Sequence, residues 1–208
     1  MVPLAFTVFG YTILFFSAKS VIQPVVDIWS LMATDTPFNE NDTYSDLYSG
    51  EIFREYTDTI PSSIITFPSP GTKYGEIKID GTNINCPLFF GDDSETLRRG
   101  AGQYIGSSFP GMRSTCIIGG HNNSFFDELE KCTVGTIITV ETHYGIYTYR
   151  ITGTAIKNYN DSSAFDIGAD YENLVFYTCY PFKALGLTKQ RYFVYGEYVS
   201  GPQILLDK

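Results

Sequence analysis

Residues 136–159 read TIITVETHYGIYTYRITGTAIKNY, and this stretch decides the fold. Apolar or aromatic side chains alternate with polar ones on both sides of His143-Tyr144-Gly145. Alternation with a period of two places one set of side chains on one face of a strand. A short break that contains glycine is typical of a turn between antiparallel strands. The stretch therefore predicts two strands that meet at a hairpin tip.

The same pattern continues on both sides of this hairpin. GEIKIDGTNINCPLFFG (75–91) alternates around an Asp-Gly pair, which predicts a second hairpin. STCIIGGH (114–121) is typical of a buried strand that ends at two glycines. Two further strands are predicted at LVFYTCY (174–180) and QRYFVYGEYV (190–199).

Helical segments are few and short. SETLRRGAG (94–102) predicts a helical turn with a glycine stop, and FFDELEKC (125–132) predicts a second short helix. SDLYSGEIFREY (45–56) is compatible with a third. Regularly spaced strands without long helices are typical of a closed or nearly closed β-barrel. We therefore expect a mainly β barrel of about eight strands with two or three short helices.

The N-terminus predicts attachment to a membrane. Residues 2–18 carry no charge, and apolar residues continue past Lys19 to Val26. About 20 apolar residues can span a bilayer. A cleavable signal peptide is the alternative, although Ser17-Ala18 is a poor cleavage site. The expected domains are a single-pass membrane anchor with transmembrane helix at 1–26, a linker at 27–63, and an extracellular β-barrel domain at 64–208.

Composition narrows the class of protein. The net charge is −9, and no basic face is visible, which argues against nucleic acid as a partner. The four cysteines show no C-x-x-C spacing, so the sequence predicts no metal and no cofactor. Core packing is favoured for Cys86 and Cys116, and a disulfide between them stays open because oxidation is possible outside the cell. Cys132 ends a predicted helix, which allows exposure.

Cys179 stands at the end of a predicted strand, directly before Tyr180 and Pro181. Proline removes the next ladder donor, so the thiol is expected at the rim of the sheet, where loops meet. Arg191 opens the next strand, and an antiparallel neighbour would bring it back to that rim. An arginine there can lower a thiol pKa and stabilise an oxyanion. Taken alone, Cys179 also fits core packing, and Arg191 also fits a surface charge.

The chain has two histidines, and one of them must serve a nucleophilic cysteine as acid or base. His121 follows a buried strand and a Gly-Gly pair, where the backbone can bend and another chain can approach closely. We therefore expect His121 to project into a cleft. His143 lies at a hairpin tip, and we expect a solvated turn residue without a catalytic role.

The segments Gly119-Gly120-His121 and Thr178-Cys179, followed by Arg191, resemble the sortases, which are cysteine transpeptidases of Gram-positive bacteria. The resemblance covers roughly residues 74–200. It includes LRRGAGQYIGSSFPG, FFDELEKCTVGTIITVET, TCYPF and KQRYFVYGEYV in the same order. The stretches Cys-Tyr-Pro-Phe and Leu-Arg-Arg-Gly-Ala-Gly most resemble class D. The layout of anchor, linker and catalytic barrel is also that of the family.

The resemblance implies a function and a role for each residue. Cys179 would be the nucleophile that cleaves an LPxTG-like sorting signal after threonine. His121 would protonate the leaving amine and then deprotonate the incoming one, and Arg191 would stabilise the oxyanion. Thr178 would help to position the substrate. The acyl group would pass to an amine of a peptidoglycan precursor or of another protein.

The chain departs from the usual family pattern in places, and two other readings stay open. Asn122 replaces a frequent arginine, and Phe176 and Tyr177 stand where leucine is frequent, which would reshape the groove. Residues 35–38 (DTPF) are a faint echo of the lid motif of pilin-building sortases and fit a plain linker. A thiol peptidase would use the same residues, with water resolving the acyl-enzyme. A non-enzymatic secreted β-barrel binding module would instead bury Cys179.

Overall fold

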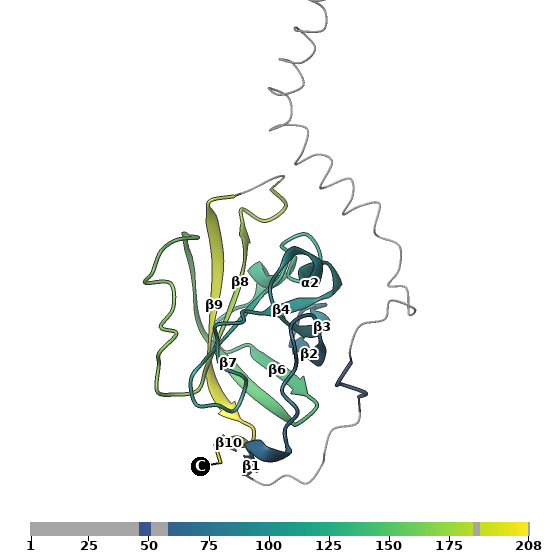
Figure 1. Cartoon of the computed structure of the whole chain (residues 1–208). Coiled ribbons are helices and arrows are strands. Elements are labelled where there is room, and N and C mark those ends of the chain that lie inside the picture. Colours follow the sequence, from purple (N-terminus) through teal and green to yellow (C-terminus); the bar gives the residue numbers. More distant parts are fainter. Residues whose placement is uncertain (1–45, 51–57, 185–187, 208) are drawn as a thin grey trace, which may run out of the picture. The chain divides into compact units, whose positions relative to one another are not determined.

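The computed structural model describes residues 46–50, 58–184 and 188–207 of the chain (Figure 1). Eight strands form a closed barrel in the order β2-β3-β4-β5-β8-β9-β7-β6. Their bounds are β2 (Lys73–Ile79), β3 (Asn85–Phe90), β4 (Ala101–Gln103), β5 (Thr115–Gly119), β6 (Ile137–Thr142), β7 (Gly145–Asn158), β8 (Asn173–Tyr180) and β9 (Gln190–Ser200). The predicted mainly β barrel of about eight strands is confirmed.

Both predicted hairpins are present. Strands β6 and β7 pair antiparallel from Ile137↔Arg150 to Thr142↔Gly145, around the quoted turn. Strands β2 and β3 also pair antiparallel, and the amide of Ile79 donates to the carbonyl of Ile84 at 3.1 Å, which closes their turn. Gly81 has a φ of 73° in this turn, a conformation that glycine adopts without steric cost.

The short elements differ most from expectation. Strands β1 (Thr59–Pro61) and β10 (Gln203–Leu205) pair in parallel as a separate two-stranded sheet. Like β4, each has three residues, too few for an alternating pattern to show. Helix α2 (Ser94–Arg99) was predicted, and the side chain of Asp93 caps it by accepting from the amides of Glu95 and Thr96.

Of the other two predicted helices, one needs correction and one lies mostly outside the described residues. The helix predicted at residues 125–132 is a run of turns with one 3-10 segment, η2 (Leu129–Lys131). Within the segment 45–56, residues 46–50 are described and are not helical, and Asp46 forms a β-bridge with Lys73. Residues 51–56 lie outside the described residues, so a short helix there stays a prediction. Another 3-10 segment, η1 (Ser62–Ile64), follows β1. In the corrected segment 125–132, tertiary contacts with the barrel override a weak local helix propensity.

The sheet separates two apolar clusters. The interior cluster fills the barrel and includes the buried side chains of Leu174 and Phe176 from β8. The outer cluster is smaller and consists of Ile117, Ala164, Val175 and Phe193, with Phe165, Tyr177 and Tyr195 packed against it. Its non-strand members lie in the connection between β7 and β8. The hydroxyl of Tyr195 donates to the Ala164 carbonyl at 2.8 Å and fixes this connection on the outer face.

The cysteines are free thiols. Cys86 and Cys116 are buried in the barrel core, as expected, and the disulfide left open between them is not formed. Cys132 is also buried, at 5% exposure, so the exposure allowed for it from sequence is wrong. Burial raises the pKa of Cys86 to about 12 and that of Cys132 to about 11. These thiols therefore behave as small apolar core residues.

Several predicted features lie outside the described residues. They include the membrane anchor at 1–26, most of the linker at 27–63, and the DTPF motif at 35–38. In the part of the chain that the structure describes, there is no helix with the length and apolar character needed to cross a membrane. Within the linker, Tyr48 is 5% exposed and donates a hydrogen bond to Glu141 of β6 at 2.8 Å. The predicted domain boundaries stay predictions.

Candidate active site

Three neighbouring strands have one of their termini where the candidate residues lie. Strand β5 pairs in parallel with β8, with Gly119 opposite Tyr177. Strand β8 pairs antiparallel with β9, with Cys179 opposite Arg191. The order β5-β8-β9 in the barrel therefore brings the end of β5, the end of β8 and the start of β9 to one rim. Figure 1 shows β8 beside β9.

The Cys179 side chain lies on the outer face of the barrel. Leu174 and Phe176 belong to the interior cluster and Val175 and Tyr177 to the outer one, so alternation along β8 assigns Cys179 to the outside. The residue is half-buried, unlike the other three cysteines. A thiol that is held by a strand and open on one side can meet a substrate. The binding-module reading, which requires a buried Cys179, loses support.

Arg191 shares this outer face with Cys179. Side chains of directly opposite residues in an antiparallel pair have Cβ atoms about 4.5–5.5 Å apart. The Nη1 atom of Arg191 donates to the carbonyls of Thr188 at 2.8 Å and Gln190 at 3.0 Å. These bonds fix one edge of the guanidinium at the start of β9. The other N–H donors of the Arg191 guanidinium can bind an oxyanion next to the thiol.

His121 follows the end of β5, with Gly120 between them. The amide of Gly120 donates to the Tyr177 carbonyl at 3.2 Å, which extends the pairing with β8 by one residue. The carbonyl of His121 accepts a hydrogen bond from the amide of Phe126 at 3.0 Å, so the backbone turns sharply here. A Cβ atom on Gly120 would lie 2.7 Å from the Phe126 ring, which explains the need for glycine before His121.

The His121 imidazole is half-buried, and its environment favours the neutral form. Burial lowers the pKa of His121, and the positive charge of Arg98 on α2 lowers it further. Arg98 belongs to the stretch LRRGAG, to which the sequence analysis gave a helical turn and a family resemblance but no role in the site. A neutral imidazole near pH 7 can accept a proton, as a general base must.

Thr178 faces the barrel interior, between the two outer-face residues Tyr177 and Cys179. It is 1% exposed, and its Oγ1 donates to the Gly120 carbonyl at 2.6 Å. This hydrogen bond ties the strand of the nucleophile to the backbone directly before His121. The expected contact of Thr178 with substrate stays a prediction, whereas this bond gives it a structural task that the sequence did not reveal.

Asn122 was noted only as a departure from the family pattern. It is 7% exposed, and its Nδ2 donates to the carbonyl of Pro181 at 3.0 Å. The bond joins the turn after His121 to the turn after Cys179. Sequence reasoning could not find this contact, because it depends on two loops that become neighbours only when β5 pairs with β8.

His143 is not the solvated turn residue that the sequence predicted. It is half-buried, its amide donates to the Tyr74 carbonyl at 3.1 Å, and its ring packs edge-on against Tyr144. Burial lowers the pKa of His143. The correction has a physical reason: the hairpin tip folds against β2 of the barrel wall, so a polar turn residue becomes partly covered.

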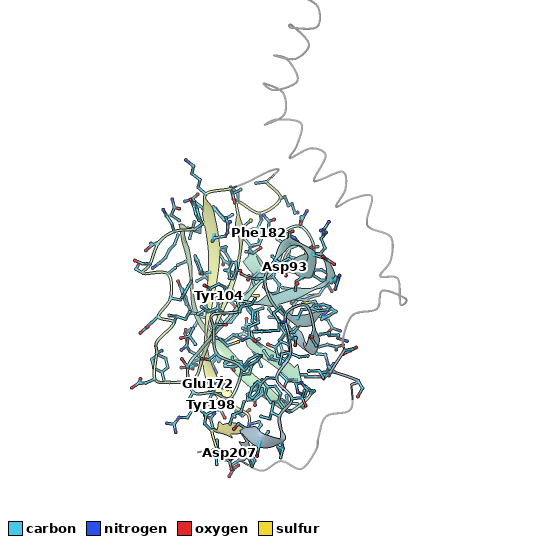
Figure 2. All side chains as sticks on the ribbon, in the orientation of Figure 1. Asp93, Tyr104, Glu172, Phe182, Tyr198 and Asp207 are labelled. Carbon is cyan, nitrogen blue, oxygen red and sulfur yellow. The ribbon has the colours of Figure 1, made fainter. Side chains whose placement is uncertain are left out.

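A hollow of about 450 Å³ lies away from these residues. Its lining consists of Arg113, Asp170, Tyr171, Glu172, Glu197, Tyr198 and Gln203. Figure 2 shows Glu172 and Tyr198 toward one end of the barrel and Phe182, three residues after the nucleophile candidate, toward the other. The Glu172 carboxylate is already bonded by the amides of Gly111 and Arg113. Over residues 46–50, 58–184 and 188–207, no cluster of three or more His, Cys, Asp or Glu could hold a metal ion.

Comparisons with known proteins concern the family and the fold. Residues 77–199 match the family described as the Sortase domain. The chain is 29% identical to Sortase D of Bacillus subtilis (strain 168) over 144 residues, which are 69% of this chain and 73% of the relative. Among solved structures, the Clostridium perfringens Sortase D5 transpeptidase matches with a TM-score of 0.57 at 21% identity, over 64% of this chain and 83% of that one. Clostridium perfringens sortase C with the C-terminal cell wall sorting motif matches with a TM-score of 0.58 at 22% identity, over 64% and 73%.

Proposed function

Because this chain belongs to the sortase family of cysteine transpeptidases, we propose that it cleaves an LPxTG-like sorting signal after threonine and transfers the acyl group to an amine. The observation that carries the proposal is the cross-strand pair Cys179–Arg191 on the outer face, next to the Gly120–His121 turn. A nucleophile, a cation for the oxyanion and an imidazole are the three groups that acyl transfer through a thioester requires.

The first half of the proposed reaction forms the acyl-enzyme. Neutral His121 takes the thiol proton of Cys179 as the sulfur attacks the threonine carbonyl, and the carbonyl π electrons move to oxygen. Arg191 stabilises this oxyanion through guanidinium donors other than the bound Nη1 edge. When the tetrahedral intermediate collapses, the C–N bond breaks, and protonated His121 gives its proton to the leaving amine. The products are a thioester on Cys179 and the released C-terminal fragment.

The second half returns the enzyme to its starting state. An acceptor amine attacks the thioester carbonyl, and His121 takes the proton that the nitrogen must lose. The C–S bond breaks, and the leaving sulfur of Cys179 takes this proton from His121, which restores the thiol and the neutral imidazole. We propose that the acceptor is an amine of a peptidoglycan precursor or of another protein. The Clostridium perfringens sortase C structure includes a C-terminal cell wall sorting motif, which supports a substrate of this class here.

The proposed cellular setting follows from the N-terminal sequence. An apolar segment at residues 1–26 would anchor the chain in the cell membrane by a single pass. The catalytic barrel would then face the outside, where secreted proteins and wall precursors meet. Thr178 is included in the proposal as a residue that helps to position the substrate.

The test uses a fluorogenic peptide that contains an LPxTG motif, with and without an added amine. Cys179→Ala should abolish cleavage, His121→Ala should lose nearly all activity, and Arg191→Ala should lose about 10²–10³-fold in kcat, as for loss of an oxyanion donor. His143→Ala is the matched control and should stay close to wild type. Circular dichroism of each variant checks that the barrel is intact.

Two outcomes would contradict the proposal. A Cys179→Ala variant that still cleaves the peptide removes the nucleophile, and a His143→Ala variant as damaged as His121→Ala means that the wrong histidine was chosen. If the protein is a thiol peptidase, the peptide is hydrolysed at the same rate with and without the added amine, and no amine is found in the product. Mass spectrometry of the product, run with triglycine, diaminopimelate or a lysine peptide, separates that reading from transpeptidation.

A further inference from the structure

The last turn of helix α2 lies beside His121. Strand β4 pairs antiparallel with β5, with Gly102 opposite Gly119. Continued by two residues, this register sets Gly100, the C-cap residue of α2, opposite His121. Neighbouring strands lie about 4.8 Å apart, so the end of the helix is one strand spacing from His121 and two from Cys179.

Helix α2 also packs on the outer face of the sheet, where His121 lies. Gly120 faces the interior ring of Phe126, so alternation assigns His121 to the outer face. Gly102 shares this face, because it stands directly opposite the residue two positions before His121. A Cβ atom on Gly102 would lie 3.0 Å from Cδ2 of Leu97, which places the helix against β4 on that face.

The charged groups of this rim follow one another across the sheet. Arg191 on β9 stands opposite Cys179, and His121 lies on the other side of Cys179. Arg98, in the last turn of α2, lies beyond His121. Its positive charge lowers the pKa of His121, which requires the two side chains to be close. In acyl transfer Arg191 holds the carbonyl oxygen, so the entering nitrogen lies on the His121 side and meets Arg98 next.

Arg98 has no acidic partner in the part of the chain that the structure describes. The side chain is exposed, its Nε donates to the Ser94 carbonyl at 3.2 Å, and no ion pair includes it. The adjacent Arg99 instead forms an ion pair with Glu95. The N–H groups on the terminal nitrogens of Arg98 are therefore available to bind a carboxylate in the bidentate manner that a guanidinium favours.

We propose that Arg98 is a specificity-determining residue for the acceptor and binds a carboxylate carried next to the attacking amine. The inference rests on the proposed function. The amine and the carboxylate of an amino acid are attached to one carbon, so the amine can face His121 while the carboxylate faces Arg98. A cation at this place also disfavours a protonated amine that has no carboxylate. The protein should therefore prefer an amino acid with a free carboxylate over an amine without one.

Two acceptors of matched shape test the inference. Glycine carries a carboxylate next to its amine, and glycinamide carries a neutral amide there. With one LPxTG-type donor peptide, kcat/KM for each acceptor is measured from the transfer product by mass spectrometry. Wild type should prefer glycine once both values are corrected for the fraction of unprotonated amine. Arg98→Gln should reduce the glycine-to-glycinamide ratio by about fivefold, as for loss of an exposed ion pair of good geometry. A change in the His121 pKa affects both acceptors equally and cancels in this ratio.

Further variants separate this role from a general effect of the helix. Replacing both Glu95 and Arg99 by glutamine is the matched control, because it removes the neighbouring ion pair and leaves Arg98 in place. Its acceptor ratio should stay close to that of wild type. Arg98→Lys keeps the charge without the planar fork and should retain part of the preference. Added salt should lower the wild-type ratio toward that of Arg98→Gln. Circular dichroism checks that each variant is folded.

Several results would overturn the inference. They are an unchanged ratio in Arg98→Gln, an equal loss for both acceptors, an equal change of the ratio in the control variant, or capture of triglycine but not of glycine by wild type. Donor peptides with glutamate or glutamine after the glycine of the motif test the leaving fragment. If Arg98→Gln alters only the ratio of these two donors, Arg98 contacts that fragment and the inference is wrong. If wild type transfers the acyl group to no amine, the proposed function itself fails, so the two failures are distinguishable.

Discussion

Replacing Thr178 by valine tests how the two sides of the candidate active site are joined. The exchange keeps the shape of the side chain but removes the hydroxyl that donates to the Gly120 carbonyl at 2.6 Å. A typical hydrogen bond contributes about 0.5–1.5 kcal/mol net, and an unsatisfied buried acceptor costs about 1–3 kcal/mol. Gly120 is buried, so we expect the free energy of unfolding to fall by about 1–3 kcal/mol.

The same change should reach the chemistry through the backbone. His121 directly follows Gly120, and a small displacement of a catalytic group can cost about 10²-fold in rate. We therefore expect kcat/KM of Thr178→Val to fall by about 10- to 100-fold, measured with the fluorogenic donor peptide. Urea unfolding gives the stability of the same preparation. Thr178→Ser retains the hydroxyl and should lie within a few-fold of wild type in activity.

The valine and serine variants together show whether the hydroxyl or the methyl group of Thr178 is needed for activity. If Thr178→Val is as active and as stable as wild type, the hydrogen bond does not hold the His121 turn. If Thr178→Ser loses as much activity as the valine variant, the methyl group contacts the substrate and the hydroxyl is secondary. That second result would favour the direct substrate role that was predicted for Thr178 from sequence.

Further predictions concern titration and redox state. Arg98→Gln should raise the pKa of His121, because it removes a nearby positive charge, whereas the pKa of His143 should not move. NMR titration of the two imidazoles in a Cys179→Ala background measures both pKa values. An unchanged pKa of His121 would contradict the proximity of Arg98. The free energy of unfolding should fall as the pH drops below about 6.5, because both histidines have folded-state pKa values below the unfolded value of about 6.5. In that pH range the unfolded chain binds more protons than the folded one. In urea unfolding, a His143→Asn variant should show a smaller loss of this free energy with falling pH. A reducing agent should leave the unfolding temperature unchanged, since all four cysteines are free thiols, and a clear decrease would reveal a disulfide.

Long strands with strict alternation were predictable from the sequence. The hairpins around residues 80–84 and 143–145 follow from period-two patterns and turn chemistry, which act locally. Strands β1, β4 and β10 were not predictable, because three residues carry no period and owe their pairing to partners far along the chain. The helix expected at 125–132 failed for a related reason, since packing of Phe126 and Leu129 into the core fixes turns there.

The contacts of the candidate site also include some that could be predicted from the sequence and others that could not. Cys179 and Arg191 could be proposed as neighbours because one antiparallel connection joins their strands. The contact of Asn122 with Pro181 and the inward bond of Thr178 to Gly120 both depend on the non-local pairing of β5 with β8. No pattern in one sequence encodes those distances.

The two-stranded sheet of β1 and β10 has a practical consequence. It anchors the last described residues beside the start of the barrel, and the carboxylate of Asp207 accepts a hydrogen bond from the Ser63 amide at 2.8 Å. Figure 2 shows Asp207 toward the end of the barrel opposite Phe182. A bead, a dye or a surface coupled through the C-terminus would thus leave the thiol accessible to large protein substrates, provided that residues 203–205 are retained.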